Sequence, residues 1–356
     1  MVPKVSILIP TKNGEEYLEE CLNMVFKQKT DFDYEVICVD SGSKDRTLEI
    51  INKFQNKYFC HSEGAVATEE SQSNALRSFT DAQDDKGGIK IFQILPQEFG
   101  HGRTRNLAAS KAQGEFLVFL TQDAISANES WLENIIKPLK EDVEVAGVFG
   151  RHLPRKDCDP FQRKSINDFM ESLKNNLTCQ LSGSGDREQE FEKNKNKLAF
   201  FSNVNSAIRR SVWEKIPFQD VEMGEDQFWA KDILLAGYKK DYAPEAKVYH
   251  SHNYGIWNQF KRWFDEYCQH KKNLNYVGVS AAYKIPYLAL RLWINDVKYI
   301  RRQNEYNFGQ KIYWTLWIFF MDLARFSAEY LGARYDKLPV WMQNSLSMQY
   351  ELIHKK

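Results

Sequence analysis

The chain has 356 residues, of which 43% are apolar, and its formal net charge is zero. This composition excludes a disordered chain, and no net positive charge points to nucleic acid. The length predicts one large domain or two of ordinary size. The cysteines are scattered without a C-x-x-C pair, which indicates a reducing compartment and neither a disulfide framework nor a zinc site.

The first 150 residues alternate apolar runs of strand composition with segments of helical spacing. The strand-like runs are residues 5–9, 34–39, 89–95, 116–120 and 143–149, and the helical segments include 15–26, 45–57, 107–112 and 131–140. This alternation predicts an α/β sheet of parallel strands joined by helical crossovers. Residues 60–88 interrupt the pattern, because they are polar and acidic, and we interpret them as an insertion without chemistry of its own.

The C-terminal region, residues 256–356, has helical spacing, many aromatic side chains and an excess of Lys and Arg. Because the whole chain is neutral, residues 1–255 carry the opposite excess, so we expect a separate catalytic domain there. Two interpretations of the basic region remain open. It is an interfacial helix that rests on anionic lipid, or a helical hairpin that packs on the sheet or forms a homodimer with a second copy.

No targeting or spanning segment is expected in this chain. No apolar run reaches the roughly 18–20 residues that cross a bilayer, and no basic-then-apolar leader precedes the first strand. The expected location is therefore cytoplasmic, with peripheral attachment to the cytoplasmic face of the cell membrane under the interfacial interpretation.

The most informative stretch is GEFLVFLTQDA, residues 114–124. Its apolar part has the composition of a strand that is buried on both faces, and Thr121, Gln122 and Asp123 follow at the carboxyl end. Ligands of open α/β sheets bind beyond that end. Asp123 is therefore a candidate to hold a divalent cation against a diphosphate. The alternative is a cap on the next helix.

A second candidate segment, residues 98–106, lies between a strand and a helix. Gly100 and Gly102 form half of a dinucleotide-binding fingerprint, but Arg105 stands where the third glycine is needed, which excludes a nicotinamide site. Glycines together with Arg103 and Arg105 at a helix N-terminus suit phosphate oxygens. The alternative is ordinary turn glycines beside surface arginines.

Two further groups of titratable residues lie later in the chain. Glu225 and Asp226 open a helix, where adjacent carboxylates cannot share one face, so only one is expected to reach a reacting group. The alternative is that both serve the helix dipole. His250 and His252 follow a short strand. In an extended chain they point to opposite sides, so at most one is expected to face a cation at Asp123.

Four segments in order resemble glycosyltransferase family 2, the inverting GT-A nucleotide-sugar enzymes, over roughly residues 4–252. They read VSILIPTKNGEEYLEECL, EVICVDSGSKDRTLEII, RTRNLAASKAQGEFLVFLTQDA and GEDQFWAKDILLAGY. The pieces EFGHGRTRN and TQDA are most similar to the bacterial rhamnosyltransferases that use dTDP-L-rhamnose. The resemblance implies a Rossmann-like GT-A mixed sheet flanked by helices in residues 1–255, followed by a helical C-terminal extension.

The resemblance also implies roles for individual residues. The nucleotide-sugar-binding candidates are Pro10, Thr11, Asn13, Asp40, Ser41, His101, Arg103, Arg105, Asn106 and Gln122. Thr121 replaces the first aspartate of the family's DXD motif, so Asp123 is the remaining motif carboxylate for Mg²⁺ or Mn²⁺. His252, or alternatively His250, matches a further metal ligand. Glu225 and Asp226 match the catalytic ED motif, whose aspartate is the general base.

The expected activity is transfer of a sugar to a hydroxyl of a lipid-linked or polysaccharide acceptor in cell-surface glycan synthesis. The expected donor is dTDP-L-rhamnose, with a UDP-sugar as the alternative. An inverting transfer needs one base opposite the leaving nucleotide diphosphate, and that charge must be neutralised. The competing hypothesis is a non-catalytic nucleotide-sugar-binding or scaffold subunit, because Thr121 departs from the motif.

Overall fold

The computed structural model describes residues 3–59, 88–182, 185–221 and 223–350. Contacts divide the chain into two compact units. The first comprises Met1–Leu153 and Met170–His250, and the second comprises Pro154–Phe169 and Ser251–Lys356. The functional division at residue 255 stays a prediction. The expected insertion at residues 60–88 lies outside the described residues except for Gly88.

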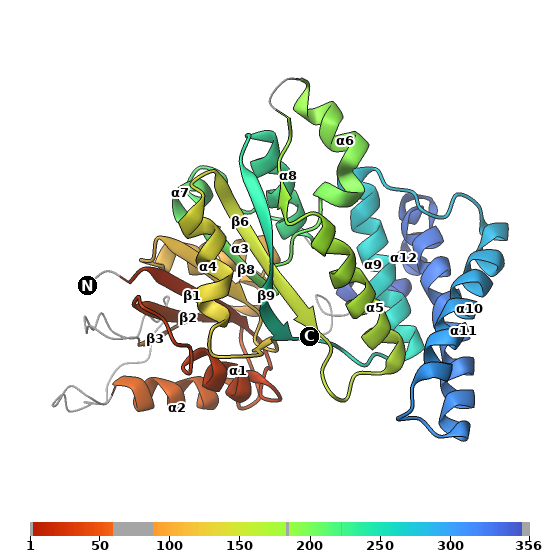
Figure 1. Cartoon of the computed structure of the whole chain (residues 1–356), viewed down its shortest axis with the longest axis horizontal. Helices are drawn as coiled ribbons and strands as arrows, with labels where there is room; N and C mark the ends of the chain where they lie inside the picture. The colour runs from red at the N-terminus through yellow and green to blue at the C-terminus, as the bar shows by residue number, and fades with distance from the viewer. Residues whose placement is uncertain (1–2, 60–87, 183–184, 222, 351–356) are drawn as a thin grey trace. The chain divides into compact units, whose positions relative to one another are not determined.

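The first unit is built on one mixed β-sheet (Figure 1). Its strands are β1 (Val5–Thr11), β2 (Tyr34–Asp40), β3 (Ile89–Gln93), β4 (Phe116–Leu120), β5 (Ile125–Ser126), β6 (Val145–Leu153), β7 (Thr178–Cys179), β8 (Asn205–Arg209) and β9 (Lys239–Tyr249). Across the sheet they follow the order β3-β2-β1-β4-β8-β6-β9-β5, and β7 pairs with β9. Strands β1 to β4 are mutually parallel, whereas β8 is antiparallel to both β4 and β6.

Strand β8 is the main departure from the sheet that the residue pattern predicts. Its sequence begins with Asn205 and Ser206, both fully buried, so no apolar run marks it. Hydrogen bonds compensate for the burial: the Asn205 amide donates to the Ala246 carbonyl at 2.8 Å and accepts from the Trp131 indole at 2.9 Å. A polar but satisfied strand therefore separates the parallel half of the sheet from the rest.

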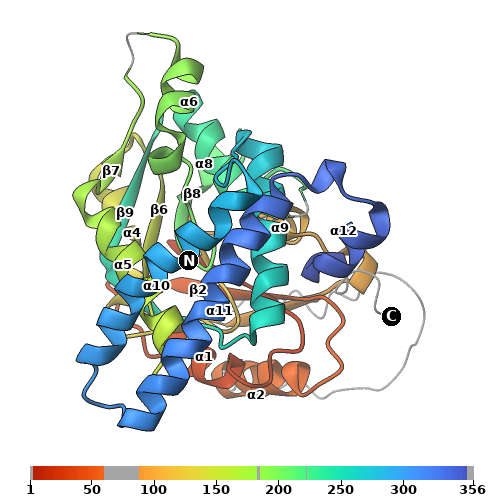
Figure 2. The same ribbon diagram turned by 90° about the vertical axis from the view of Figure 1, so that its right-hand side faces the viewer.

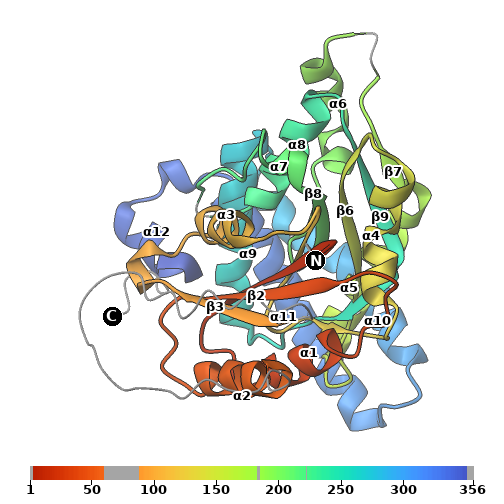
Figure 3. The same ribbon diagram turned by 90° about the vertical axis from the view of Figure 1, so that its left-hand side faces the viewer.

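Helices cover both faces of the sheet in the first unit. They are α1 (Leu18–Val25), α2 (Thr47–Phe59), α3 (His101–Lys111), α4 (Trp131–Glu141), α6 (Arg187–Leu198), α7 (Arg210–Trp213) and α8 (Glu225–Leu235). Alternate residues of β1, namely Val5, Ile7 and Ile9, pack in one core cluster with the apolar sides of α1, α2 and α4. Figure 3 shows α1 and α2 on one side of β1, β2 and β3, and α3 on the other.

The second unit is helical, as the sequence predicts. It contains the start of α5 (Pro160–Ser172) and then α9 (Ile256–Leu274), α10 (Ile285–Arg302), α11 (Phe308–Gly332) and α12 (Val340–Leu346). Helix α11 packs against both α9 and α10 (Figure 2). Among the residues that the structure describes, no helix has the length and apolarity needed to span a membrane.

Candidate active site

The turns after β1, β2 and β4 meet at one edge of the sheet. Gln122 joins two of them, because its amide both donates to the Lys12 carbonyl and accepts from the Lys12 N–H, each at 2.9 Å. The Ser41 N–H donates to the Thr11 carbonyl at 2.9 Å. Since the amide of Gln122 is used by Lys12, it fixes the turn that carries Asn13.

Asp40 organises the turn between β2 and α2. Its carboxylate is fully buried and accepts hydrogen bonds from Thr11 Oγ1 at 3.2 Å and from the backbone N–H groups of Gly42 and Ser43 at 3.1 and 2.9 Å. The neighbouring Ser41 is also fully buried, and its Oγ has no hydrogen-bond partner among the described residues. This hydroxyl is a polar group at the sheet edge whose hydrogen-bonding capacity is still open.

The turn after β1 is held in an unusual backbone conformation. Asn13 has a φ of 47°, in the left-handed region, and its side-chain oxygen accepts from the Lys44 N–H at 2.9 Å. Pro10 and Thr11 are the last residues of β1. The candidates from the first two motifs therefore share one rigid surface at the carboxyl ends of β1 and β2.

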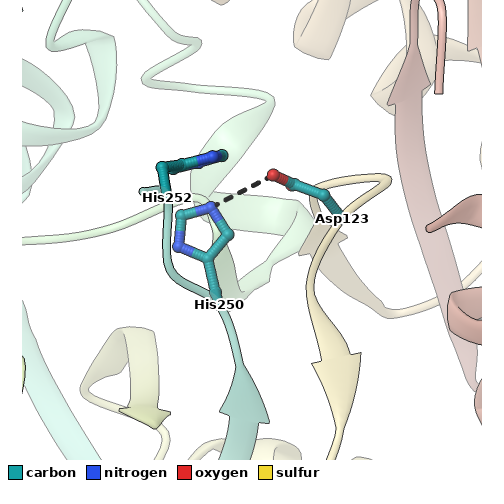
Figure 4. Close-up of side chains that lie close together, drawn as sticks. All are labelled: Asp123, His250 and His252. Carbon is teal, nitrogen blue, oxygen red and sulfur yellow. Dashed lines mark ion pairs between the residues drawn. The ribbon is translucent and has the colours of Figure 1, made fainter. Parts of the chain in front are cut away.

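Asp123 and His250 are brought together by the short strand β5. Ile125 of β5 pairs with Tyr249 of β9, so Asp123 precedes that pair by two residues and His250 follows it directly. His250 Nε2 lies 3.5 Å from Asp123 Oδ2. Ligand atoms of Asp123, His250 and His252 all lie within 4.8 Å of one another, and Figure 4 shows the three side chains converging.

The expectation that only one histidine faces Asp123 is therefore wrong. Strand β9 ends at Tyr249, so His250 and His252 lie beyond it, where the alternation of an extended strand no longer applies. One carboxylate with two imidazoles is a donor set that suits Mn²⁺ or another divalent transition metal.

His152 lies beside His250, and no motif in the sequence predicts this position. Its ring lies 5.7 Å from that of His250. Burial, with a further contribution from His250, lowers the pKa of His152 to about 3, so this ring is neutral near pH 7. His152 therefore packs beside the candidate metal ligands as an uncharged group.

Glu225 and Asp226 are the first two residues of α8. Gly224 precedes them with a φ of 81°, a conformation that strongly favours glycine, and so directs the chain into the helix. Glu225 is buried and its Oε1 lies 3.1 Å from Arg105 Nη1, while it also accepts from the Asn203 side chain at 3.1 Å. Asp226 instead accepts from the Asn203 N–H at 3.1 Å and from the Gln227 N–H at 2.8 Å.

The two carboxyl groups differ in their proton affinity. Burial acts to raise the pKa of Glu225, but the Arg105 guanidinium and further favourable charges and hydrogen bonds outweigh it, so the net shift is downward. Burial and then the negative charge of Glu225 raise the pKa of Asp226 to about 7. Glu225 is thus a fixed anion, and Asp226 exchanges a proton near neutral pH.

The segment directly before β8 connects this acidic pair with the end of β4. The Thr121 N–H donates to the Val204 carbonyl at 3.2 Å, and the adjacent residue, Asn203, binds both carboxylates of the pair. No motif in the sequence singles out Asn203. The structure therefore anchors the acidic pair and the turn that begins at Thr121 to neighbouring residues of one segment.

The segment expected to bind phosphate is helical from His101 onward, six residues earlier than predicted. Arg105 binds Glu225, and Arg103 forms an exposed ion pair with Asp220 at 2.6 Å. The Asn106 side chain donates to the Phe218 carbonyl at 2.7 Å and accepts from the Phe218 N–H and the Trp213 indole. Within this segment the structure brings Arg105 to the acidic pair, while Asn106 is occupied by the chain that leads to α8.

His101 is the first residue of α3, and its ring meets the Phe99 ring edge-on at a centroid distance of 5.2 Å. Its positive field contributes to the lowered pKa of Glu225, so it too lies near the acidic pair. The predicted site residues therefore fall into three groups: the turn residues 10–13 and 40–41, the Asp123 group, and the acidic pair with Arg105 and His101.

Comparison with known proteins assigns the chain to a family. Residues 6–66 and 68–216 match the model of glycosyl transferase family 2. The chain is 32% identical over 265 residues to the O-antigen chain rhamnosyltransferase RfbN of Salmonella typhimurium, across 74% of this chain and 71% of that relative. It is 34% identical over 275 residues to the O-antigen chain rhamnosyltransferase WbaN of Salmonella anatum, with the same two shares covered.

A solved structure of the same fold is the mannosyltransferase PcManGT from Pyrobaculum calidifontis in complex with GDP-Man and Mn²⁺. It matches with a TM-score of 0.54 and 17% identity, over 95% of this chain and 89% of that one. The expected GT-A architecture and the resemblance to glycosyltransferases are thereby confirmed. The chain belongs to glycosyl transferase family 2.

Proposed function

We propose that this enzyme transfers L-rhamnose from dTDP-L-rhamnose to a hydroxyl group of a glycan acceptor, with inversion at the anomeric carbon, in cell-surface glycan synthesis. One observation carries the proposal: Asp226, with a pKa of about 7, accepts from the Asn203 N–H, and the neighbouring Val204 binds Thr121 at the end of β4. The identity of the donor sugar is inferred from the printed names of the two Salmonella relatives.

Asp226 is the proposed general base. As a carboxylate it accepts the proton of the acceptor hydroxyl while the bond from that oxygen to the sugar C1 forms. The bond from C1 to the diphosphate oxygen breaks, and dTDP leaves with the electron pair. A base with a pKa near the working pH is best matched to this task. Glu225, kept ionised by Arg105, acts as a positioning residue that keeps the pKa of Asp226 high.

Asp123, His250 and His252 are the proposed ligands of Mg²⁺ or Mn²⁺. The two imidazoles favour Mn²⁺, because Mg²⁺ prefers oxygen ligands. A bound cation would neutralise charge on the leaving diphosphate. The three side chains already lie close together, so little rearrangement is needed to bind a cation.

The donor nucleotide is proposed to lie over the turns after β1 and β2. Asp40 and Ser41 would read the pyrimidine ring, and residues 10–13 would contact the ring and ribose. Asp40 is held by four hydrogen-bond donors from Thr11, Gly42 and Ser43 among the described residues, which makes it a preformed acceptor site. Gln122 and Asn106 are proposed to support these surfaces, because their amides are occupied by protein partners.

The second unit is proposed to rest on the cytoplasmic face of the cell membrane. We define the apolar hairpin face as the exposed side chains that follow helical spacing on α10 and α11: Tyr287, Leu290, Ile294, Phe308, Ile312, Leu316 and Phe320. Basic residues, including Lys311, Arg301 and Arg302, accompany it. Apolar side chains flanked by Lys and Arg suit an anionic lipid surface. A dimer through the same face is the competing outcome.

Donor and acceptor assays with the full chain test the proposal. We expect release of dTDP from dTDP-L-rhamnose when a lipid-linked glycan acceptor is present, and little release with UDP-sugars. Preference for a UDP-sugar would replace the proposed donor while the fold and base remain. Binding of nucleotide-sugars without transfer to any acceptor would favour the non-catalytic alternative.

A further inference from the structure

A cavity within the second unit has no role in the proposed transfer so far. Its volume is about 550 Å³, within the range of small-molecule sites. Its walls come from three segments: residues 156–163 at the start of α5, residues 253–255 before α9, and residues 305–317 at the start of α11. All of these residues belong to the same compact unit.

One wall of the cavity is aromatic. It is lined by Tyr254, Tyr306, Trp314 and Trp317. The Trp314 ring lies 6.4 Å from the Trp317 ring at 89°, and 6.4 Å from the Tyr306 ring at 52°. Rings set at such angles form a concave surface rather than one closed stack. A flat ligand with C–H groups on one face can pack against it by dispersion contacts.

The polar edge of the Trp317 indole is not part of this wall. Its Nε1 has almost no accessible surface and no hydrogen-bond partner in the part of the chain that the structure describes, so a ligand oxygen in the cavity does not reach it. Trp317 therefore contributes apolar ring surface to the cavity.

The charges around the cavity argue against an anionic ligand. Arg163 is already paired with Glu305 at 2.6 Å. Asp157 and Asp159 also line the cavity, and Lys156 is the cation that remains among the lining residues. The acidic groups therefore outnumber the basic ones. A phosphate or diphosphate would face net negative charge here. Aromatic rings together with carboxylates instead suit a neutral ligand rich in hydroxyl groups, which donate to the carboxylates.

The loop that carries Tyr254 is firmly built. Asn253 accepts from the Asp159 N–H at 2.9 Å and donates to the Asp157 carbonyl at 2.9 Å. The Tyr254 ring stacks on His252 with a centroid distance of 5.2 Å and an interplanar angle of 19°. Tyr254 of the cavity wall therefore contacts His252, a candidate metal ligand only two positions away in the sequence.

We propose that this cavity binds a neutral sugar residue of the glycan acceptor, packed against the rings of Trp314 and Trp317. This inference rests on the proposed function, because only a glycosyl transfer gives the bound sugar the role of acceptor. The binding of a sugar in the cavity can be measured independently of that reaction. The cavity would thus contribute to the choice of acceptor glycan, whereas the turns of the first unit bind the donor.

The test is binding of methyl hexopyranosides to the full chain, measured by saturation-transfer NMR without any donor or metal. Inorganic diphosphate is the anionic probe, and Trp341→Ala is the matched control, because Trp341 is an exposed tryptophan elsewhere in the same unit. We expect at least one glycoside to bind the wild type and the control at millimolar concentration. Trp314→Ala should weaken that binding at least about tenfold, and diphosphate should not compete.

Trp317→Phe is a gentler variant, since it keeps an aromatic ring and removes only part of the ring surface that lines the cavity. It should weaken binding of the same glycoside severalfold, because fewer dispersion contacts remain. In transfer assays both variants should raise the acceptor KM and leave the donor KM unchanged. Absence of glycoside binding by the wild type, equal binding by Trp317→Phe, or displacement by diphosphate would overturn the inference. Failure of rhamnose transfer with glycoside binding intact would count only against the proposed donor reaction.

Discussion

The two compact units place different kinds of side chain at their surfaces. In the described part of the first unit, exposed large apolar residues are few and scattered: Leu95, Val143, Leu177 and Tyr249. At one edge of its sheet, polar side chains form hydrogen bonds with each other, as Thr11 does with Asp40. In the second unit many of the exposed apolar residues follow helical spacing along α10 and α11. The difference supports the two proposals, a charged ligand at the first surface and an apolar partner at the second.

The two surfaces bear on different questions. At the sheet edge, burial, charge and hydrogen bonding of the side chains bear on the reaction that the enzyme catalyses. On the helices, exposed apolar area bears on what the enzyme attaches to. Variants in one unit should therefore change turnover or donor binding, and variants in the other should change attachment.

The largest expected effect is at the proposed base. Asp226→Asn removes the proton acceptor, so we expect transfer to fall about a thousandfold, with dTDP binding unchanged by calorimetry. Asp232→Asn is the matched control, because Asp232 lies on the same helix but binds Gln219 at 2.7 Å. Near-normal turnover of Asp226→Asn would show that chemistry does not depend on this carboxylate.

The proposed metal ligands come next. Asp123→Asn removes the negative charge of the group, so Mn²⁺-dependent binding of dTDP should weaken at least about tenfold, and chelation by EDTA should lower wild-type activity. In the absence of metal, wild type and variant should bind dTDP equally. Identical Mn²⁺ titrations for the two proteins would remove Asp123 from the site.

The acidic pair also predicts a pH profile. Asp226 accepts a proton only when ionised, and its pKa is about 7, so kcat/KM should rise with pH through about 7. Glu225→Gln removes the negative charge that helps to keep that pKa high, so the midpoint should move to lower pH. We measure kcat/KM for the acceptor at saturating donor from pH 5 to 9. If the midpoint of the pH profile is the same in Glu225→Gln and the wild type, a group other than Asp226 controls the profile.

The second unit is tested by attachment. Leu316 is 57% exposed on the apolar hairpin face, and Val143 is 78% exposed in the first unit. Leu316→Glu should lower binding to phosphatidylglycerol vesicles about tenfold, since burial of one leucine contributes roughly 1.5–3 kcal/mol. Val143→Glu should change nothing. Sedimentation should give a monomer for both. Loss of a dimer in Leu316→Glu, with no vesicle binding by the wild type, would identify a second copy as the partner.

Much of the first unit could be predicted because its strands are short apolar runs between helical segments. Strand β8 could not, since Asn205 and Ser206 are polar, and only distant partners show that they are buried. The early start of α3 was missed for a similar reason. His101 to Asn106 show no apolar periodicity, and the helix is stabilised there by contacts of Arg105 and Asn106 with residues over 100 positions away.

The site followed the same rule. Motif order predicts Asp123 and the acidic pair as site residues, whereas the places of Asn203 and His152 beside them depend on contacts between segments far apart in the chain. The local rule for alternating histidines failed, because the end of β9 at Tyr249 is set by its neighbours in the sheet. Residue types that carry chemistry could be recognised in sequence, but the residues that position them required the fold.

The smallest expected effect concerns Ser41, whose buried hydroxyl has no partner among the described residues. Ser41→Ala removes an unsatisfied group, so the free energy of unfolding should stay within about 0.5 kcal/mol of the wild type or rise. If the hydroxyl binds the donor base, dTDP affinity should still fall by about two- to tenfold, the worth of one hydrogen bond. Chemical denaturation and calorimetry measure the two quantities separately. A variant that loses stability but keeps dTDP affinity would make Ser41 part of the scaffold, since a ligand contact should cost binding and spare the fold.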